Sequence, residues 1–370
     1  MVPMIVRTGK LKHLEIGGNL LHDLLEFNPY YGGRQVLITG KMGTGKTTLL
    51  SKLGENDLAK GAYVIWRGRT ADGFHYFKDW ESRVRILHHK NDQIRVFISK
   101  FGHNKSLEVT ERLEMVSYSS VSDLIRKVKK EVINVVFEPT FFTISKDFMV
   151  YLYSKARIKL SEADRKGAQF GTLMWFEFHQ QLLERLDSEW WTVLYDEIDD
   201  LFPSNSSGIL WHLIRWAQLT FKDFRKSLIS MFGTAHNYSD IDHRIFEKIP
   251  TKIYLAGAKV PKNSLLYKNA IQSIERGQAK IEWDNKYGEI SKLSPYPVPK
   301  ERLIVRKVWT AEIPDIGYAL VDFVAELTKT IEDYGKQKAY DLLEKWRREG
   351  MVDRNKYYYL KGLIKNAPDI

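Results

Sequence analysis

The sequence predicts an α/β fold in which a mainly parallel β-sheet is flanked by helices, followed by a small helical C-terminal segment. Three observations lead to this prediction. A glycine-rich loop at residues 40–47 separates two apolar runs, strand-like and amphipathic segments alternate over residues 36–290, and one strand-like run ends in two adjacent carboxylates. Such alternation is typical of parallel sheets, because a crossover between parallel strands normally contains a helix.

The composition limits the class of protein. A chain of 370 residues, 44% of them apolar, can form two or three structural units with a sizeable core. The absence of cysteine excludes disulfides, thiolate zinc sites and cysteine nucleophiles. No apolar run approaches the roughly 18 residues of a membrane span, and the N-terminus lacks a signal-peptide pattern. We therefore expect a soluble, cytoplasmic protein with no membrane span.

The net charge favours an anionic partner. Lysine and arginine (57) outnumber aspartate and glutamate (46), which gives a formal charge of +11. An excess of this size is typical of proteins that bind nucleic acid. The basic residues are spread along the chain, so a generally basic, solvated surface explains the charge about as well, and no binding surface is located by it.

After a lead-in segment, residues 1–35, the chain reaches its most specific motif. Residues 40–47 match the phosphate-binding pattern GxxxxGK[ST], with an apolar strand before it and a helix after it. The glycines let the backbone curl so that successive N–H groups point at phosphate oxygens. Lys46 is expected to reach the β- and γ-phosphates, and the Thr47 hydroxyl to hold a magnesium ion. The predicted cofactors are ATP and Mg²⁺, and the predicted nucleotide-binding residues are Gly40, Lys41, Met42, Gly43, Thr44, Gly45, Lys46, Thr47 and Thr48.

The elements after the loop are predicted from apolar patterning. A helix is expected from Thr47 to Leu53, and strands are expected at 62–66, 84–87, 94–99 and 133–137. The interval 70–132 is the least regular and is a candidate insertion into a core that spans residues 36–290.

The second chemical signal is the acidic pair Asp196 and Glu197. An apolar strand delivers both at its C-terminal end, where ligands of open α/β sheets bind. Hydrolysis of a nucleoside triphosphate needs one carboxylate near the magnesium and one that orients or deprotonates water, and the two residues fit these roles in that order. An apolar run that ends in two acids is common by itself. Its position downstream of a complete phosphate-binding loop favours the hydrolytic interpretation over a simple acidic turn.

A helical pattern over 210–224 and an apolar strand over 227–235 follow, and the strand ends at His236. A hydrogen-bonding side chain in this place could sense a γ-phosphate. A core strand capped by a polar loop fits the same residues equally well.

These residues together resemble the FtsK/HerA superfamily of P-loop DNA-pumping ATPases, which includes plasmid-transfer and viral genome-packaging relatives. The loop at 40–47 is similar to the family's loop, the pair at 196–197 to its acidic pair, and residues 235–242 and 249–253 to the segment after its sensor strand. The resemblance covers roughly residues 33–290. It implies a P-loop NTPase core that hydrolyses ATP, acts on DNA and assembles into a homo-oligomeric ring, for which six subunits are a candidate number.

The resemblance also implies roles for single residues. His236 stands where the family usually has a sensor glutamine, and a histidine can still donate a hydrogen bond. Arg225 occupies a position similar to that of the family's arginine finger, which acts across the subunit boundary, and Arg215 is the alternative. An arginine that is merely solvated or paired with a carboxylate is the competing interpretation. The implied catalytic residues are Lys46, Glu197, Arg225 and His236, and the implied metal ligands are Thr47 and Asp196.

The C-terminal part is predicted as a linker, residues 291–312, and a helical segment, residues 313–370. Trp346 begins a W-R-R-E-G sequence, and an aromatic run at 357–360 follows it. This order looks like the second half of a winged-helix module with a hairpin-like wing. A simple helical tail fits the same residues as well.

The predicted function is an ATP-hydrolysing DNA translocase or packaging-type motor of a mobile element, a virus or a chromosome-handling system. Two alternatives stay open. One is an AAA+-like loader or switch ATPase whose C-terminal winged helix binds DNA, and the other is a non-catalytic nucleotide-binding scaffold. The sequence does not choose among DNA structures, directions of movement or ring sizes.

Overall fold

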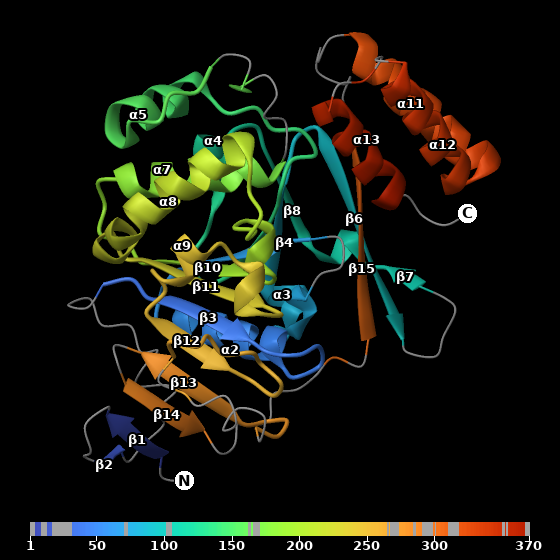
Figure 1. The fold of residues 1–370 in the computed structure, drawn as a ribbon. Helices are drawn as coiled ribbons and strands as arrows, with labels where there is room; N and C mark the ends of the chain where they lie inside the picture. The colour runs from blue at the N-terminus through green and yellow to red at the C-terminus, as the bar shows by residue number, and fades with distance from the viewer. Residues whose placement is uncertain are drawn as a thin grey trace. The chain divides into compact units, whose positions relative to one another are not determined.

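The computed structural model describes two compact units of the chain (Figure 1). The first unit comprises Met1–Ser161 and Ala168–Trp309, and the second comprises Glu162–Gly167 and Thr310–Ile370. The described residues are 4–8, 13–16, 32–69, 73–100, 106–161, 164–165, 171–264, 266, 274–283, 286–290, 299, 301–309, 318–349, 352 and 354–366.

The first unit is built on a twelve-stranded sheet. Its parallel part contains, in spatial order, β12 (Thr251–Tyr254), β3 (Gln35–Thr39), β11 (Ile229–Ala235), β10 (Trp191–Tyr195), β4 (Tyr63–Gly68), β9 (Ile133–Phe137), β5 (Val84–His89) and β8 (Glu114–Tyr118). The sheet continues beyond β12 with the antiparallel strands β13 (Ala279–Trp283), β14 (Lys286–Ile290), β1 (Met4–Thr8) and β2 (His13–Ile16).

Helices cover both faces of this sheet, which explains why its central strands are apolar throughout. In β3, Val36 and Ile38 pack in one core cluster with leucines of α2, whereas Leu37 between them packs in another cluster with α7 and α8. The longer helices of the unit are α2 (Lys46–Ala59), α4 (Val121–Lys127), α5 (Lys146–Ala156), α7 (Met174–Glu184) and α8 (Gly208–Lys226). Shorter helical turns are α3 (Trp80–Arg83), α9 (His243–Phe246), η1 (Phe74–Tyr76), η2 (Thr110–Arg112), η3 (Gly171–Leu173), η4 (Ile198–Asp200) and η5 (Tyr238–Asp240).

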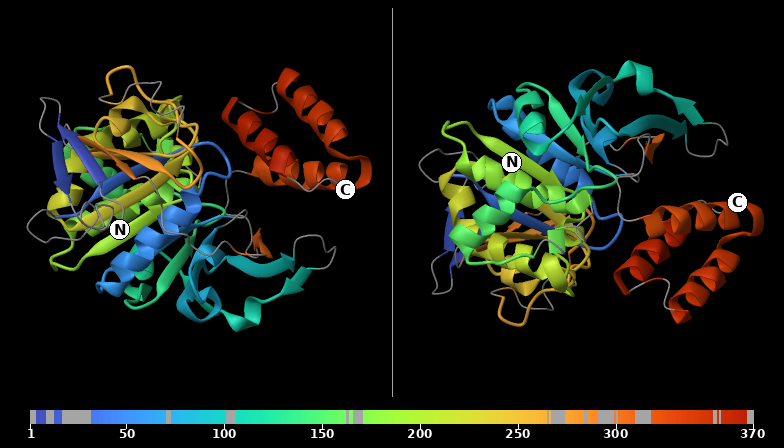
Figure 2. Two further views of the ribbon diagram at one scale, coloured as in Figure 1. Left: turned by 90° about the horizontal axis from the view of Figure 1, so that it is seen from below. Right: turned by 90° about the horizontal axis from the view of Figure 1, so that it is seen from above.

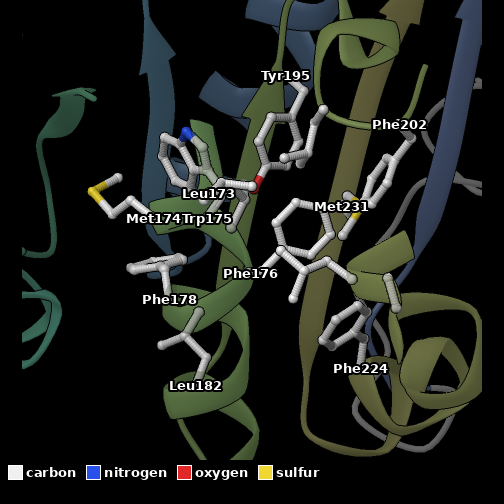
Figure 3. Packing of buried hydrophobic residues seen from close by; sticks show 14 of the residues in the cluster. Leu173, Met174, Trp175, Phe176, Phe178, Leu182, Tyr195, Phe202, Phe224 and Met231 are labelled. Atoms are coloured by element: carbon white, nitrogen blue, oxygen red, sulfur yellow. The ribbon is translucent and has the colours of Figure 1, made fainter. Parts of the chain in front are cut away.

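The α7 side of the core is rich in aromatic residues. Figure 3 shows Trp175 and Phe176 of α7 beside Tyr195 of β10, with Met231 of β11 close to them. The rings of Trp175 and Tyr195 meet edge to face with their centroids 5.4 Å apart. This packing fixes α7 against the strand that leads directly into the acidic pair.

A small second sheet is formed by strands from the two intervals that were expected to be an insertion and a linker. It has the order β15 (Glu301–Trp309), β6 (Asp92–Lys100) and β7 (Ser106–Glu108). The interval 291–312, expected as a linker, thus contains a strand that pairs with β6 over its whole length. Its alternation explains the strand, since Leu303 and Val305 are buried while Arg302 and Arg306 are exposed. The candidate insertion 70–132 supplies β6 and β7, and it also adds β5 and β8 to the main sheet.

The described residues of the second unit form three helices, α11 (Tyr318–Tyr334), α12 (Lys336–Arg348) and α13 (Arg354–Asn366), drawn in red in Figures 1 and 2. The aromatic run at 357–360 is helical, so its hairpin-like interpretation is wrong. The reason is its spacing, since Tyr357, Leu360 and Ile364 lie on one side of α13 and fill the core of this unit together with Trp346. No strand is found among the described residues of the unit.

The predicted fold class, a mainly parallel sheet flanked by helices with a helical C-terminal segment, is confirmed by this arrangement. Along the described residues, no helix is long and apolar enough to cross a membrane.

Candidate active site

The predicted site residues meet at one edge of the sheet. Because β3, β11, β10, β4 and β9 are parallel neighbours, the segments that follow them all leave at the same edge. These segments are the glycine-rich loop, His236, the acidic pair, the arginines at the end of β4, and Glu138. The topology thereby brings together residues that lie up to about 200 positions apart in the chain.

The glycine-rich loop joins β3 to α2 in a conformation that needs its glycines. Gly43 has φ +74° and Gly45 has φ +94°, both in the left-handed region that favours glycine. Thr44 Oγ1 closes the loop by donating to the Lys41 carbonyl at 2.8 Å, and the Met42 side chain is exposed. No side chain caps α2 at Gly45, which leaves the first N–H groups of the helix, including that of Thr48 in its first turn, available to an anion.

Lys46 holds its ammonium group inside the hollow of this loop. Its Nζ donates to the carbonyls of Gly40 at 2.9 Å and Lys41 at 3.1 Å, and it lies 3.4 Å from His236 Nδ1. Burial lowers the pKa of Lys46, while the negative charges of Asp196 and Glu197 oppose that shift. A phosphate in the loop would meet this charge at short range.

The Thr47 hydroxyl and the Asp196 carboxylate place two oxygen atoms side by side. Thr47 Oγ1 donates to Asp196 Oδ2 at 3.0 Å, and Thr234 Oγ1 donates to Asp196 Oδ1 at 2.6 Å. Burial raises the pKa of Asp196, and the hydroxyls of Thr234 and Thr47 oppose that shift. A hydroxyl and a carboxylate oxygen side by side are the hard donors that Mg²⁺ prefers, so this donor set fits the ion.

Glu197 is held in an unusual backbone conformation. Its φ is +61°, which is rare for a residue with a side chain. Its N–H donates to Thr234 Oγ1 at 2.9 Å, and its carboxylate accepts a hydrogen bond from Arg69. Burial would raise the pKa of Glu197, but the hydrogen bond and charge of Arg69 hold this pKa below its usual range. Arg69 also contacts Asp200 at 2.8 Å, so it bridges two carboxylates.

His236 lies between the loop and the acidic pair. Its Nδ1 faces Lys46, and its Nε2 is 3.8 Å from Glu197 Oε1. The side chain is about half exposed, so a ligand in the loop could reach it. This is the place where a hydrogen-bond donor to a terminal phosphate would be needed.

Arg225 does not lie in this site within one chain. It ends α8 at the opposite edge of the sheet, where its carbonyl accepts a hydrogen bond from Gly33 N at 2.8 Å just before β3. Arg215 is exposed on α8, with its guanidinium 5.7 Å from the ring centre of Trp211. A finger role for either arginine therefore needs a neighbouring subunit and stays a prediction.

The structure adds residues around the acidic pair that the sequence did not predict, namely Arg69 and Thr234, which contact the pair directly, and Arg67, Glu138 and Trp175 next to them. Arg67 of β4 is buried and donates from Nε to Glu138 Oε1 at 2.6 Å, and Trp175 Nε1 donates to the same oxygen at 2.8 Å. The available signal was positional, since Arg67 and Glu138 each stand at the C-terminal end of a predicted strand. Nothing in the local sequence of Trp175 indicates its contact.

No protein-family model matches the chain, and no curated protein matches it. Among solved structures, it is similar to the genome packaging NTPase B204 of Sulfolobus turreted icosahedral virus 2 in complex with ATP-gammaS, with 11% identity, 75% of this chain and 98% of that chain covered, and a TM-score of 0.34. It is also similar to the bacterial conjugative coupling protein TrwB, with 9% identity, 80% and 95% covered, and a TM-score of 0.44. The pCW3 conjugation coupling protein TcpA matches with 12% identity, 78% and 64% covered, and a TM-score of 0.36.

Proposed function

We propose that this chain is an Mg²⁺-dependent ATPase. The observation that carries the proposal is the meeting of the phosphate-binding loop with Asp196 and Glu197 at one sheet edge, where Thr47 and Asp196 are 3.0 Å apart. The loop, the pair of oxygen ligands and a second carboxylate are the parts that hydrolysis of a nucleoside triphosphate requires. A glycine turn between a strand and a helix would not need a carboxylate beside its threonine.

Each residue has a role that follows from its position. Lys46 and the N–H groups of the loop hold the phosphates, while Thr47 and Asp196 would hold Mg²⁺. Bound Mg²⁺ supplies positive charge to the phosphate oxygens. Glu197, with its low pKa, accepts a hydrogen bond from the attacking water and so orients it. His236, next to Lys46, donates a hydrogen bond to the terminal phosphate.

We further propose that ATP hydrolysis drives a DNA translocase or packaging-type motor that works as a homo-oligomeric ring in the cytoplasm. The family resemblance over residues 33–290 and the charge of +11 support this. Contacts to DNA phosphates would make the affinity fall as salt rises. The loader alternative loses support, because the described C-terminal helices contain no wing. The scaffold alternative is tested directly by turnover.

The test measures ATP hydrolysis by the purified chain with Mg²⁺ or EDTA, with and without single- or double-stranded DNA, together with the oligomer mass. We expect Mg²⁺-dependent hydrolysis that Lys46→Ala abolishes, because the loop then loses the ammonium group that lies in its hollow. Glu197→Gln should retain ATP binding and lose turnover. A wild-type protein that binds ATP but shows no hydrolysis with either DNA would overturn the ATPase proposal and favour the scaffold.

A further inference from the structure

The left-handed backbone of Glu197 is held from both sides. Its N–H donates to Thr234, and its carbonyl accepts hydrogen bonds from Asp200 N at 3.3 Å and from Arg67 Nη1 at 3.4 Å. A non-glycine residue rarely adopts this region, and it persists there only where its surroundings define it. Such strain at a proposed catalytic carboxylate indicates that the orientation of Glu197 matters to the chemistry.

Arg67 is in turn held by a built network. Its side chain is 4% exposed, and its charge is paired with Glu138 at 2.6 Å and, at the longer distance of 3.8 Å, with Asp200. Glu138 also accepts hydrogen bonds from Trp175 Nε1 at 2.8 Å and Thr172 Oγ1 at 3.2 Å. Burial would raise the pKa of Glu138, but the charge and hydrogen bond of Arg67 hold this pKa below its usual range. Arg67 is therefore a fixed cation with a fixed direction.

The network connects three neighbouring strands. Glu138 follows β9, Arg67 lies in β4, and Glu197 follows β10, and these strands are adjacent in the order β9, β4, β10. Trp175 adds a link from the helix layer, since its ring also packs on Tyr195, two residues before Glu197 (Figure 3). Glu138 thus reaches the backbone of Glu197 through one side chain.

We propose that Glu138 and Arg67 are positioning residues that hold Glu197 in the orientation required for hydrolysis. The proposal rests on the proposed ATPase function. Neither residue contacts the phosphate-binding loop in the structure, so their loss should affect the rate of hydrolysis and leave nucleotide affinity nearly unchanged. A misplaced catalytic group typically costs about 10- to 100-fold in rate.

The test compares Glu138→Gln with a matched control, Asp57→Asn. Asp57 forms a buried pair with Arg34 at 2.5 Å, at the opposite edge of the same sheet. Both variants neutralise one carboxylate beside an arginine, and kcat is compared per folded molecule so that a change in stability is not counted as a change in rate. We expect Glu138→Gln to lower kcat about 10- to 100-fold with the KM for ATP and the Kd for a fluorescent ATP analogue within about threefold. Asp57→Asn should leave kcat per folded molecule unchanged.

A Glu138→Gln protein that keeps the wild-type kcat, or one whose kcat falls no more than that of Asp57→Asn, would overturn the proposal. If Glu138→Gln does not fold, Thr172→Val replaces it, because it removes only the hydroxyl that binds Glu138 Oε2. That variant should lower kcat about two- to fivefold with unchanged Kd, as expected for one lost hydrogen bond, and an unchanged kcat would again contradict the proposal. An inactive wild-type protein overturns the ATPase function instead, which keeps the two failures distinct.

Discussion

At the scale of single residues, two carboxylates that are adjacent in sequence have opposite electrostatic environments. Asp196 is half-buried and burial raises its pKa, which the two neighbouring hydroxyls oppose, whereas Arg69 holds the pKa of Glu197 below its usual range. The raised pKa of Asp196 suits a proposed ligand of Mg²⁺, since a cation would favour its charged form. The lowered pKa of Glu197 suits a carboxylate proposed to accept a hydrogen bond from water.

Replacing Arg69 by Gln should move the pH dependence of turnover. Without the guanidinium, the pKa of Glu197 rises, so a larger fraction of Glu197 is protonated at a given acidic pH. We expect the acid limb of the kcat profile to shift to higher pH, measured by steady-state hydrolysis between pH 5 and 9. Arg83→Gln, which breaks the pair between Arg83 and Glu55, is the control and should not move the acid limb. An acid limb that stays in place would contradict this explanation.

Replacing Asp196 by Asn should stabilise the ligand-free protein and remove its response to Mg²⁺. The folded-state pKa of Asp196 is raised, so its charge destabilises the fold at pH values above its ordinary pKa, and a neutral amide removes that cost. We expect unfolding to require about 0.5–2 kcal/mol more in free energy, as is common when a functional site is neutralised. Melting curves with and without Mg²⁺ and ATP test both the gain in stability of the ligand-free protein and the loss of its response to Mg²⁺. A lower melting temperature without ligand would contradict the prediction.

At the scale of elements, α2 lies close enough to β10 that one glycine sets their distance. A Cβ added at Gly54 would lie 2.4 Å from Leu194 Cδ1 and 3.3 Å from Phe77 Cε1. Leu194 is buried two residues before Asp196, so the closeness of this contact helps to place the acidic pair beside the first turn of α2. The packing of an element and the geometry of the site are thus connected through one contact.

Gly54→Ala should therefore destabilise the first unit although alanine favours helices. Overpacking costs about 1–3 kcal/mol, which exceeds the 0.5–1 kcal/mol that alanine gains over glycine in a helix. Gly362→Ala in α13 is the matched control, because its Cβ would meet nothing within 4 Å. We expect a loss of stability for the first and a small gain for the second in urea unfolding. The same sign for both variants would show that the contact at Gly54 has no energetic effect.

For the whole molecule, Arg225 does not lie at the proposed active site of its own chain. Arg225 stands at the sheet edge opposite the loop, so in an oligomer it could act only on a neighbour. A role of Arg225 across a subunit boundary is compatible with this position. That role can be tested without the structure of an oligomer.

Mixing two inactive variants should restore activity if Arg225 acts in trans. Lys46→Ala lacks the phosphate ligand, and Arg225→Ala lacks the finger. In mixed oligomers, some interfaces join an intact loop to an intact arginine, and we expect hydrolysis to reappear with a dependence on the mixing ratio. Arg215→Ala, mixed in the same way, tests the alternative finger. An Arg225→Ala protein with wild-type turnover would exclude Arg225 from this role.

Much of the fold and part of the site follow from local patterns. The loop, its flanking strand and helix, the strand before Asp196 and the strand before His236 could all be predicted because apolar runs of strand length alternate with helical periodicity. The strand β15 was harder to predict from the sequence, because a proline-rich segment just before it suggested a linker and because its partner strand β6 lies about 200 residues earlier. The aromatic run of α13 suggested a strand because tyrosine is enriched in strands, whereas the helical spacing of Tyr357, Leu360 and Ile364 places them in one core.

The chemistry of the phosphate-binding loop could be predicted from the sequence alone, because its glycines, Lys46 and Thr47 lie within eight consecutive residues. The sequence also predicted that Asp196 and Glu197 supply the carboxylates of a nucleotide-hydrolysis site. Only the tertiary structure decided which residues surround that pair. Arg67 and Arg69 come from the end of β4 and Glu138 follows β9, far along the chain, and the order β9, β4, β10 brings them beside the pair. Strand order depends on packing of the whole sheet, and no local pattern encodes it.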